Sequence, residues 1–216
     1  MNVSRFLGNE ADMQTRYPAR AGQFYPGDEA SLAEALDAHF AAAGDVEASR
    51  LRAVMLPHAG WMFCGDTIAR TLAHAEVPEV AIVVSPKHTP FGPTWSVACH
   101  DTWTWPGDAA AIDDPVRARL LDLVPELEAE ESAHAREHGV EVLVPFLRRI
   151  NPDVRIVAAA VGNVGFDDTA GLARALARIV AESDPAPLLV ISSDMNHFET
   201  EPRNRELDHL AIDTMS

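Results

Sequence analysis

Short apolar runs alternate with helical patterns along this chain, and three of the runs end next to a histidine. The run at 52–57 is followed by His58, the run at 79–85 by His88, and the run at 188–193 by His197. Such runs are typical of buried β-strands, and parallel strands place their carboxyl ends at one edge of a sheet, where ligands bind. Imidazole is both a common metal ligand and a common general base. The pattern therefore predicts a catalytic or metal site at that edge.

The rest of the chain predicts a single α/β domain. Helices are expected at 29–43, 65–75, 114–124, 137–150, 167–182 and from 203 onward, with further strands at 96–99 and 154–161. This alternation favours a mostly parallel central sheet covered by helices on both faces. Residues 1–15 are polar and aperiodic, so we expect a flexible N-terminus followed by one domain at 16–216.

Composition excludes several classes of function. Hydrophobic residues make up 47% of the 216 residues, enough for a substantial core, and the formal net charge of −16 argues against nucleic-acid and anionic-membrane partners. No P-loop, dinucleotide fingerprint or serine-hydrolase elbow is present. Two cysteines without a disulfide pattern, no signal peptide and no run of membrane-spanning length predict a cytoplasmic protein.

The first two histidines lie in loops that suit a fixed site. His58 lies between Pro57 and Gly60, which allow a sharp exit from the strand. A backbone fixed on both sides suits a ligand, although a loop histidine bonded to a neighbouring carbonyl is the alternative. Three prolines and a glycine around His88 stiffen its loop, which fits a pre-organised site or an ordinary surface turn.

Further polar groups are expected near the same edge. Asp194 could fix the tautomer of a histidine or bind a metal, or it could simply cap the following turn. A neutral His197 could remove a proton from a bound hydroxyl. His138 lies at the start of an expected helix and could point at this edge, whereas Cys64 is expected to be a packed core thiol.

Five segments taken together carry a specific resemblance. They are RYPARAGQFYP at 16–26, PHAGWMFCG at 57–65, SPKH at 85–88, EHGVE at 137–141 and SSDMNH at 192–197. In this order they resemble the Memo family, whose prokaryotic members are called AmmeMemoRadiSam system protein B. That family is similar in fold to the class III extradiol dioxygenases, whose site binds non-haem Fe(II) at strand ends.

The resemblance implies roles for the same residues. His58 and His88 correspond to metal ligands, and His197, with Asp194 beside it, to the acid–base histidine of the dioxygenases. His138 is expected to support the ligands from outside the set that binds the metal. Two histidines and an anionic ligand suit Fe(II), with copper as the alternative. Family members supply a cysteine as third ligand from a segment beyond residue 216, so we expect a chain that is truncated at its C-terminus and lacks this ligand.

We therefore expect a Memo-like metal-binding protein that acts as a redox or oxygen-dependent enzyme, a metal-dependent oxidoreductase of the dioxygenase type with an unknown small-molecule substrate. The alternative is a non-catalytic module that binds a peptide or a small anion in the ancestral site, and a further alternative is metal-dependent hydrolysis. The resemblance also implies a functional link to AMMECR1-like and radical SAM proteins.

Overall fold

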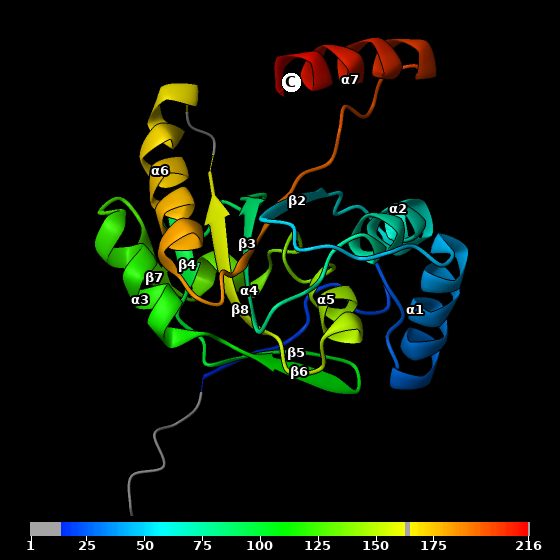
Figure 1. Cartoon of the computed structure of the whole chain (residues 1–216), viewed down its shortest axis with the longest axis horizontal. Coiled ribbons are helices and arrows are strands. Elements are labelled where there is room, and N and C mark those ends of the chain that lie inside the picture. The colour runs from blue at the N-terminus through cyan, green and yellow to red at the C-terminus, as the bar shows by residue number, and fades with distance from the viewer. Residues whose placement is uncertain (1–13, 163–164, 216) are drawn as a thin grey trace, which may run out of the picture.

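A six-stranded sheet forms the centre of the molecule (Figure 1). The computed structural model describes residues 14–162 and 165–215. In spatial order the strands are β2 (Ala53–Leu56), β9 (Leu188–Ser192), β3 (Val80–Pro86), β8 (Arg155–Val161), β4 (Trp95–Ala98) and β7 (Glu128–Glu130). The first four are mutually parallel, and β4 runs antiparallel to β8. The predicted mostly parallel α/β sheet is thus confirmed.

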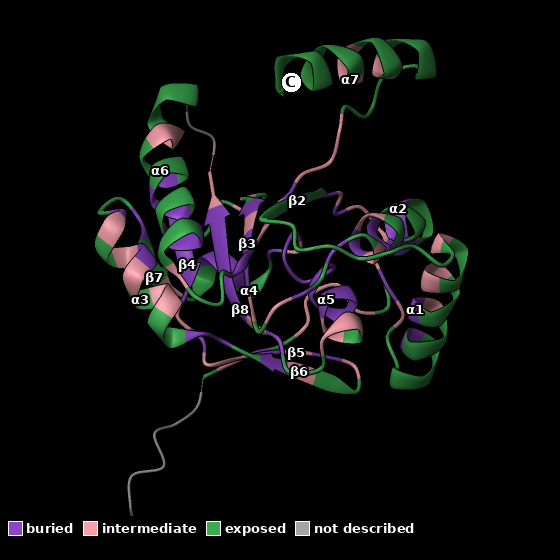
Figure 2. Cartoon of the chain, in the orientation of Figure 1, coloured by how far each residue is buried: buried purple, intermediate pink, exposed green. Residues whose placement is uncertain are grey.

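Helices pack on both faces of this sheet, as predicted. On one face α1 (Glu29–Ala43), α2 (Trp61–Ala73) and α5 (Val144–Ile150) share a hydrophobic cluster with the strands, and on the other α3 (Asp114–Leu123) and α6 (Phe166–Glu182) share a second. The central strands are almost entirely buried (Figure 2). Because both faces are covered, the strands are continuous apolar runs rather than alternating ones.

A small second sheet was not predicted. It contains β1 (Thr15–Arg16), β5 (Thr102–Trp105) and β6 (Asp108–Ala111), and a turn with Gly107 at φ 89° joins the last two. The Thr-Trp-Thr-Trp sequence of β5 alternates half-buried and buried residues, which is the period-two signal of a strand. Of the expected flexible N-terminus, residues 1–13 lie outside the described residues, and Thr15 pairs with Thr102.

The helix predicted at 137–150 is wrong in its first half. Residues 137 and 138 are irregular, residues 139–143 form turns, and α5 begins only at Val144, with Pro145 in its first turn. Two backbone N–H groups of this segment, those of His138 and Gly139, are bound by the carboxylate of Glu137 instead. Proline favours a first helical turn, so the helix starts where Pro145 allows it. A single-turn helix, α4 (Ser132–Ala135), precedes this segment.

The last helix, α7 (Glu201–Met215), stands apart from the rest of the molecule. It follows an extended segment that leaves the sheet after β9 (Figure 1), and none of its residues is buried. The helix predicted from residue 203 is thereby confirmed, with a start two residues earlier. Across the described ranges, no helix has the length and apolar character that crossing a membrane requires.

Candidate metal centre

His58 leaves the end of β2 with its ring orientation fixed by the neighbouring strand. Its Nδ1 lies 2.7 Å from Ser192 Oγ, and that hydroxyl donates its proton to the carbonyl of Gly139 at 2.6 Å. Because the hydroxyl has only one proton to donate, it must accept from His58, which therefore carries its proton on Nδ1. The Nε2 lone pair of this buried ring is thus left free for a ligand.

His88 follows β3 and is held by a buried carboxylate. Its Nδ1 lies 2.7 Å from Oε1 of Glu137, and its backbone N–H donates to Oε2 at 2.6 Å. Glu137 is 1% exposed. A carboxylate that accepts from Nδ1 fixes the tautomer and orientation of a metal-binding histidine. Nε2 of His88 is therefore the free nitrogen, as in His58.

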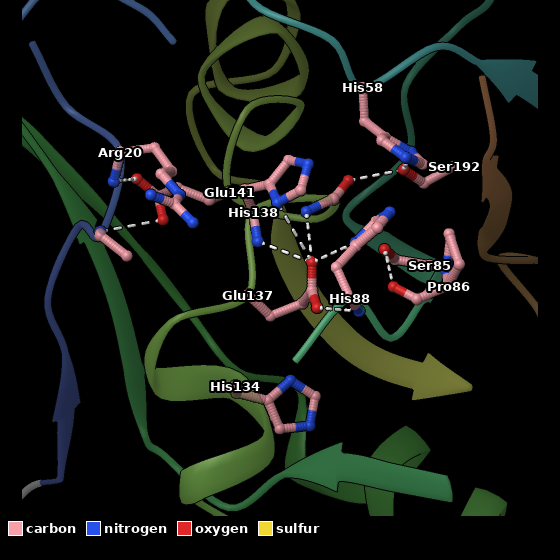
Figure 3. Close-up of polar contacts among 12 residues, drawn as sticks. Arg20, His58, Ser85, Pro86, His88, His134, Glu137, His138, Glu141 and Ser192 are labelled. Atoms are coloured by element: carbon pink, nitrogen blue, oxygen red, sulfur yellow. Dashed lines mark hydrogen bonds and ion pairs between the residues drawn. The ribbon is translucent and has the colours of Figure 1, made fainter. Parts of the chain in front are cut away.

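His138 brings a third imidazole to the same place. The three histidines each offer one ring nitrogen, and these nitrogens all lie within 4.8 Å of one another. The ring centroids of His88 and His138 are 4.4 Å apart, and those of His58 and His88 are 5.0 Å apart. Figure 3 shows the three side chains extending from separate segments, with Glu137 beneath two of them. The cluster could therefore hold a metal ion, because imidazole suits iron, copper and zinc.

The local environment sets the charge of each group. Burial lowers the pKa of His58, and burial together with the nearby His88 lowers the pKa of His138 to about 4. The hydrogen bond to Glu137 raises the pKa of His88. Burial of Glu137 opposes its ionisation, yet the hydrogen bonds from the side chain and backbone of His88 and the backbone of His138 bring its pKa down to about 2. Glu137 is therefore held ionised, and burial favours in His58 and His138 the neutral form that binds a metal.

A buried ion pair anchors the segment that carries Glu137 and His138. Arg16 and Glu141 are each 1% exposed, and their Nη1 and Oε2 atoms are 2.5 Å apart. The guanidinium of Arg16 also donates to the carbonyls of His134 and Glu137. Glu141 accepts from the Tyr25 hydroxyl at 2.7 Å and from backbone N–H groups at 19 and 20. Contacts from the loop at 16–25 thus hold the segment at 137–141 in place next to the histidine cluster.

Asp194 and His197 lie beside this cluster in different ways. Asp194 Oδ1 accepts the backbone N–H groups of His58 and Ala59, at 2.6 and 3.2 Å, and Oδ2 lies 3.9 Å from His58 Nε2. His197 is exposed and packs against Phe198, with ring centroids 4.3 Å apart. Within the described part of the chain, no hydrogen bond or ion pair joins Asp194 to His197.

A large cavity opens over the histidines. Its volume is 1220 Å³, and it is lined by the three clustered histidines, by Asp194 and His197, and by apolar side chains from α2, from the segment after β9 and from α7. Cys64 also lines it, but its thiol is buried and donates to the carbonyl of Ala59 at 3.1 Å. Burial raises the pKa of Cys64 to about 12, so it is a packed thiol, as predicted.

Sequence reasoning missed part of this arrangement. We expected His138 only outside the set that binds the metal, whereas its ring nitrogen lies within 4.8 Å of those of His58 and His88. Glu137 and Ser192 were not among the expected site residues. Both are instead buried partners of the histidines. Both lie in segments that carry the family resemblance, EHGVE at 137–141 and SSDMNH at 192–197, and that was the signal available for them.

Comparison with known proteins gives a consistent result. Residues 16–216 match the model of a family described as Memo-like protein. The chain is 33% identical to a MEMO1 family protein from Aquifex aeolicus over 204 residues, which cover 94% of this chain and 75% of the relative. It is 31% identical to a MEMO1 family protein from Methanobrevibacter smithii over 211 residues, covering 92% and 75%, and 33% identical to one from Ignicoccus hospitalis over 217 residues, covering 93% and 75%.

Proposed function

The chain belongs to the Memo-like protein family, and on that premise we propose that it is a metal-dependent oxidoreductase related to the non-haem iron extradiol dioxygenases. The observation that carries the proposal is the group of three imidazoles whose free nitrogens converge at the carboxyl edge of a parallel sheet. Ligand sites of open α/β sheets lie at this edge. The sheet order and the site position support a fold of the extradiol dioxygenase type.

The donor set fits a divalent transition metal. His58, His88 and His138 would hold it, and Glu137 and Ser192 would keep the first two in the tautomer that binds. Three neutral imidazoles suit iron, copper or zinc, and the family resemblance favours Fe(II) with copper as the alternative. When bound, such a metal supplies Lewis acidity and, for iron or copper, redox chemistry.

The protein's own groups then position and move protons around a bound substrate. Asp194 holds the loop of His58 through two backbone N–H groups, so it positions this ligand. His197 lies on the segment after β9, lines the cavity and is exposed, so its ring is accessible to a substrate hydroxyl and would take the proton of that hydroxyl.

Metal analysis of the full chain purified without oxygen tests this proposal. We expect about one iron or copper ion per chain, and its loss in His58→Ala and His88→Ala but not in the exposed control His209→Ala. Oxygen uptake by the iron-loaded but not the zinc-loaded protein supports redox chemistry. Hydrolytic activity restored by zinc alone contradicts it, and so does a folded wild type that takes up no metal.

A further inference from the structure

The walls of the cavity over the histidines are mostly apolar. The large apolar side chains that line it are Phe24, Met55, Met62, Phe63, Met195 and Phe198. Met62 and Phe63 are 78% and 81% exposed, although both lie in the first turn of α2, next to the histidine cluster. Pockets that bind small molecules are mostly apolar, with few polar groups that fix orientation. In this cavity the three clustered histidines supply the polar groups that could fix the orientation of a ligand.

The charges around the cavity disfavour an anionic ligand. None of its described lining residues is an arginine or a lysine, and its one acidic side chain, Asp194, is occupied by the backbone of the His58 loop. The guanidinium of Arg20 stacks over Phe24, with Cζ 5.6 Å from the ring centroid, and does not line the cavity. With a net charge of −16, the whole protein also repels anions.

The backbone conformation of Phe198 also supports a ligand site. This residue has φ 71°, a left-handed conformation that bulky side chains rarely adopt, and it is 97% exposed. Its ring lies against His197 at the cavity rim. Strained residues of this kind concentrate at ligand sites. A second aromatic ring, that of Phe24, contacts His138 edge-on with centroids 4.8 Å apart.

We propose that the ligand of this site is a neutral, largely apolar small molecule that lies between these aromatic side chains and reaches the histidines with one polar atom. This inference deepens the proposed function, because it names the substrate class of the same site. It also decides against the small-anion module considered from the sequence. An anion would enter a cavity whose described walls offer no cationic side chain of arginine or lysine to balance its charge.

Binding of 2-naphthol and 2-naphthoate to metal-free full-length protein tests the inference by calorimetry. The two probes share one ring system, and at neutral pH only the second is charged. We expect 2-naphthol to bind with a Kd at least about tenfold lower than that of 2-naphthoate. We expect Phe63→Ser, and separately Met62→Ser, to raise the Kd of 2-naphthol by about five- to tenfold.

Phe166→Ser is the matched control, because Phe166 is 91% exposed but lies on α6, on the other face of the sheet. It should leave the Kd unchanged. Equal or tighter binding of 2-naphthoate overturns the inference, and so do equal effects of the Phe63 and Phe166 variants. Since the probes are measured without metal, a failure of the metal proposal appears separately, in the metal content of the untreated protein.

Discussion

Glu137 binds His88 through both of its carboxylate oxygens, one to Nδ1 at 2.7 Å and the other to the backbone N–H at 2.6 Å. The same carboxylate accepts from the backbone of His138 at 2.8 Å. One buried acidic group therefore organises two of the three histidines, which come from distant parts of the chain. Glu137 therefore fixes the relative positions of His88 and His138 in the candidate metal centre.

Replacing Glu137 with glutamine should weaken metal binding without emptying the site. The amide keeps the shape of the side chain but loses the charge that orients and polarises His88, and loss of such partners typically costs 10–100-fold, so we expect an affinity about 10–100-fold lower. Calorimetric titration with Co²⁺ measures the change. Glu128→Gln, on an exposed residue of β7, should bind as the wild type does, and an equal loss in both variants would refute the assignment.

Ser192→Ala should weaken the site through His58. The variant removes the hydroxyl that accepts from Nδ1 and donates to the carbonyl of Gly139, so one buried nitrogen and one buried carbonyl lose a partner. We expect a loss of about 1–3 kcal/mol in the free energy of unfolding and about tenfold in Co²⁺ affinity. Ser193→Ala removes only a half-buried hydroxyl bonded to a neighbouring carbonyl. It should change the free energy of unfolding and the Co²⁺ affinity by only a small fraction of these amounts.

The buried pair Arg16–Glu141 should be a major stabilising contact when only one partner is removed. Arg16→Met leaves Glu141 charged and buried, so we expect about 3–5 kcal/mol of destabilisation in urea unfolding. Arg149→Met breaks the exposed pair with Asp37 and should cost less than about 1 kcal/mol. In a double-mutant cycle, Arg16→Met with Glu141→Gln should cost less than the sum of the single variants. Strict additivity would show that the pair is not coupled.

The free energy of unfolding should decrease at acidic pH, partly because of His134. This histidine is fully buried beside Ser96, and burial lowers its pKa from 6.5 to about 3. Below pH 6.5 the unfolded chain takes up a proton that the folded chain refuses. The free energy of unfolding should therefore fall as pH drops, by roughly 1–2 kcal/mol between about pH 6.5 and 5 from this group.

Urea unfolding at several pH values measures that slope. His134→Gln should flatten it, whatever its effect on stability at neutral pH, while the exposed His209→Gln should keep the wild-type slope. An unchanged slope in His134→Gln would show that this residue does not carry the effect.

The strands and most helices could be predicted because their patterns are local. Apolar runs at 79–85 and 154–161 became β3 and β8 within a residue or so, since both faces of the sheet are covered there. The non-helical segment at 137–143 could not be predicted, because the side chain of Glu137 replaces helical hydrogen bonds and Pro145 delays the start of the helix. A side chain that competes for backbone donors leaves no periodic signal.

The candidate site likewise has residues that could be predicted from local patterns and residues that could not. His58 and His88 could be located because each follows a strand whose end defines the ligand-binding edge. The place of His138 depends on the ion pair between Arg16 and Glu141, which anchors its segment. These two residues are far apart in the sequence, so local patterns do not reveal their contact. Long-range ion pairs of this kind can be identified only from the three-dimensional structure.

The most direct test of the three-histidine centre is anomalous diffraction from crystals of the full chain grown with Co²⁺. The proposal predicts a single strong peak bound by ring nitrogens of His58, His88 and His138 at about 2.0–2.2 Å. The same crystals of His138→Ala should show the peak weakened or gone. A peak held by His58 and His88 with His138 turned away would contradict the role of the third histidine, and no peak in a folded wild type would contradict the metal centre itself.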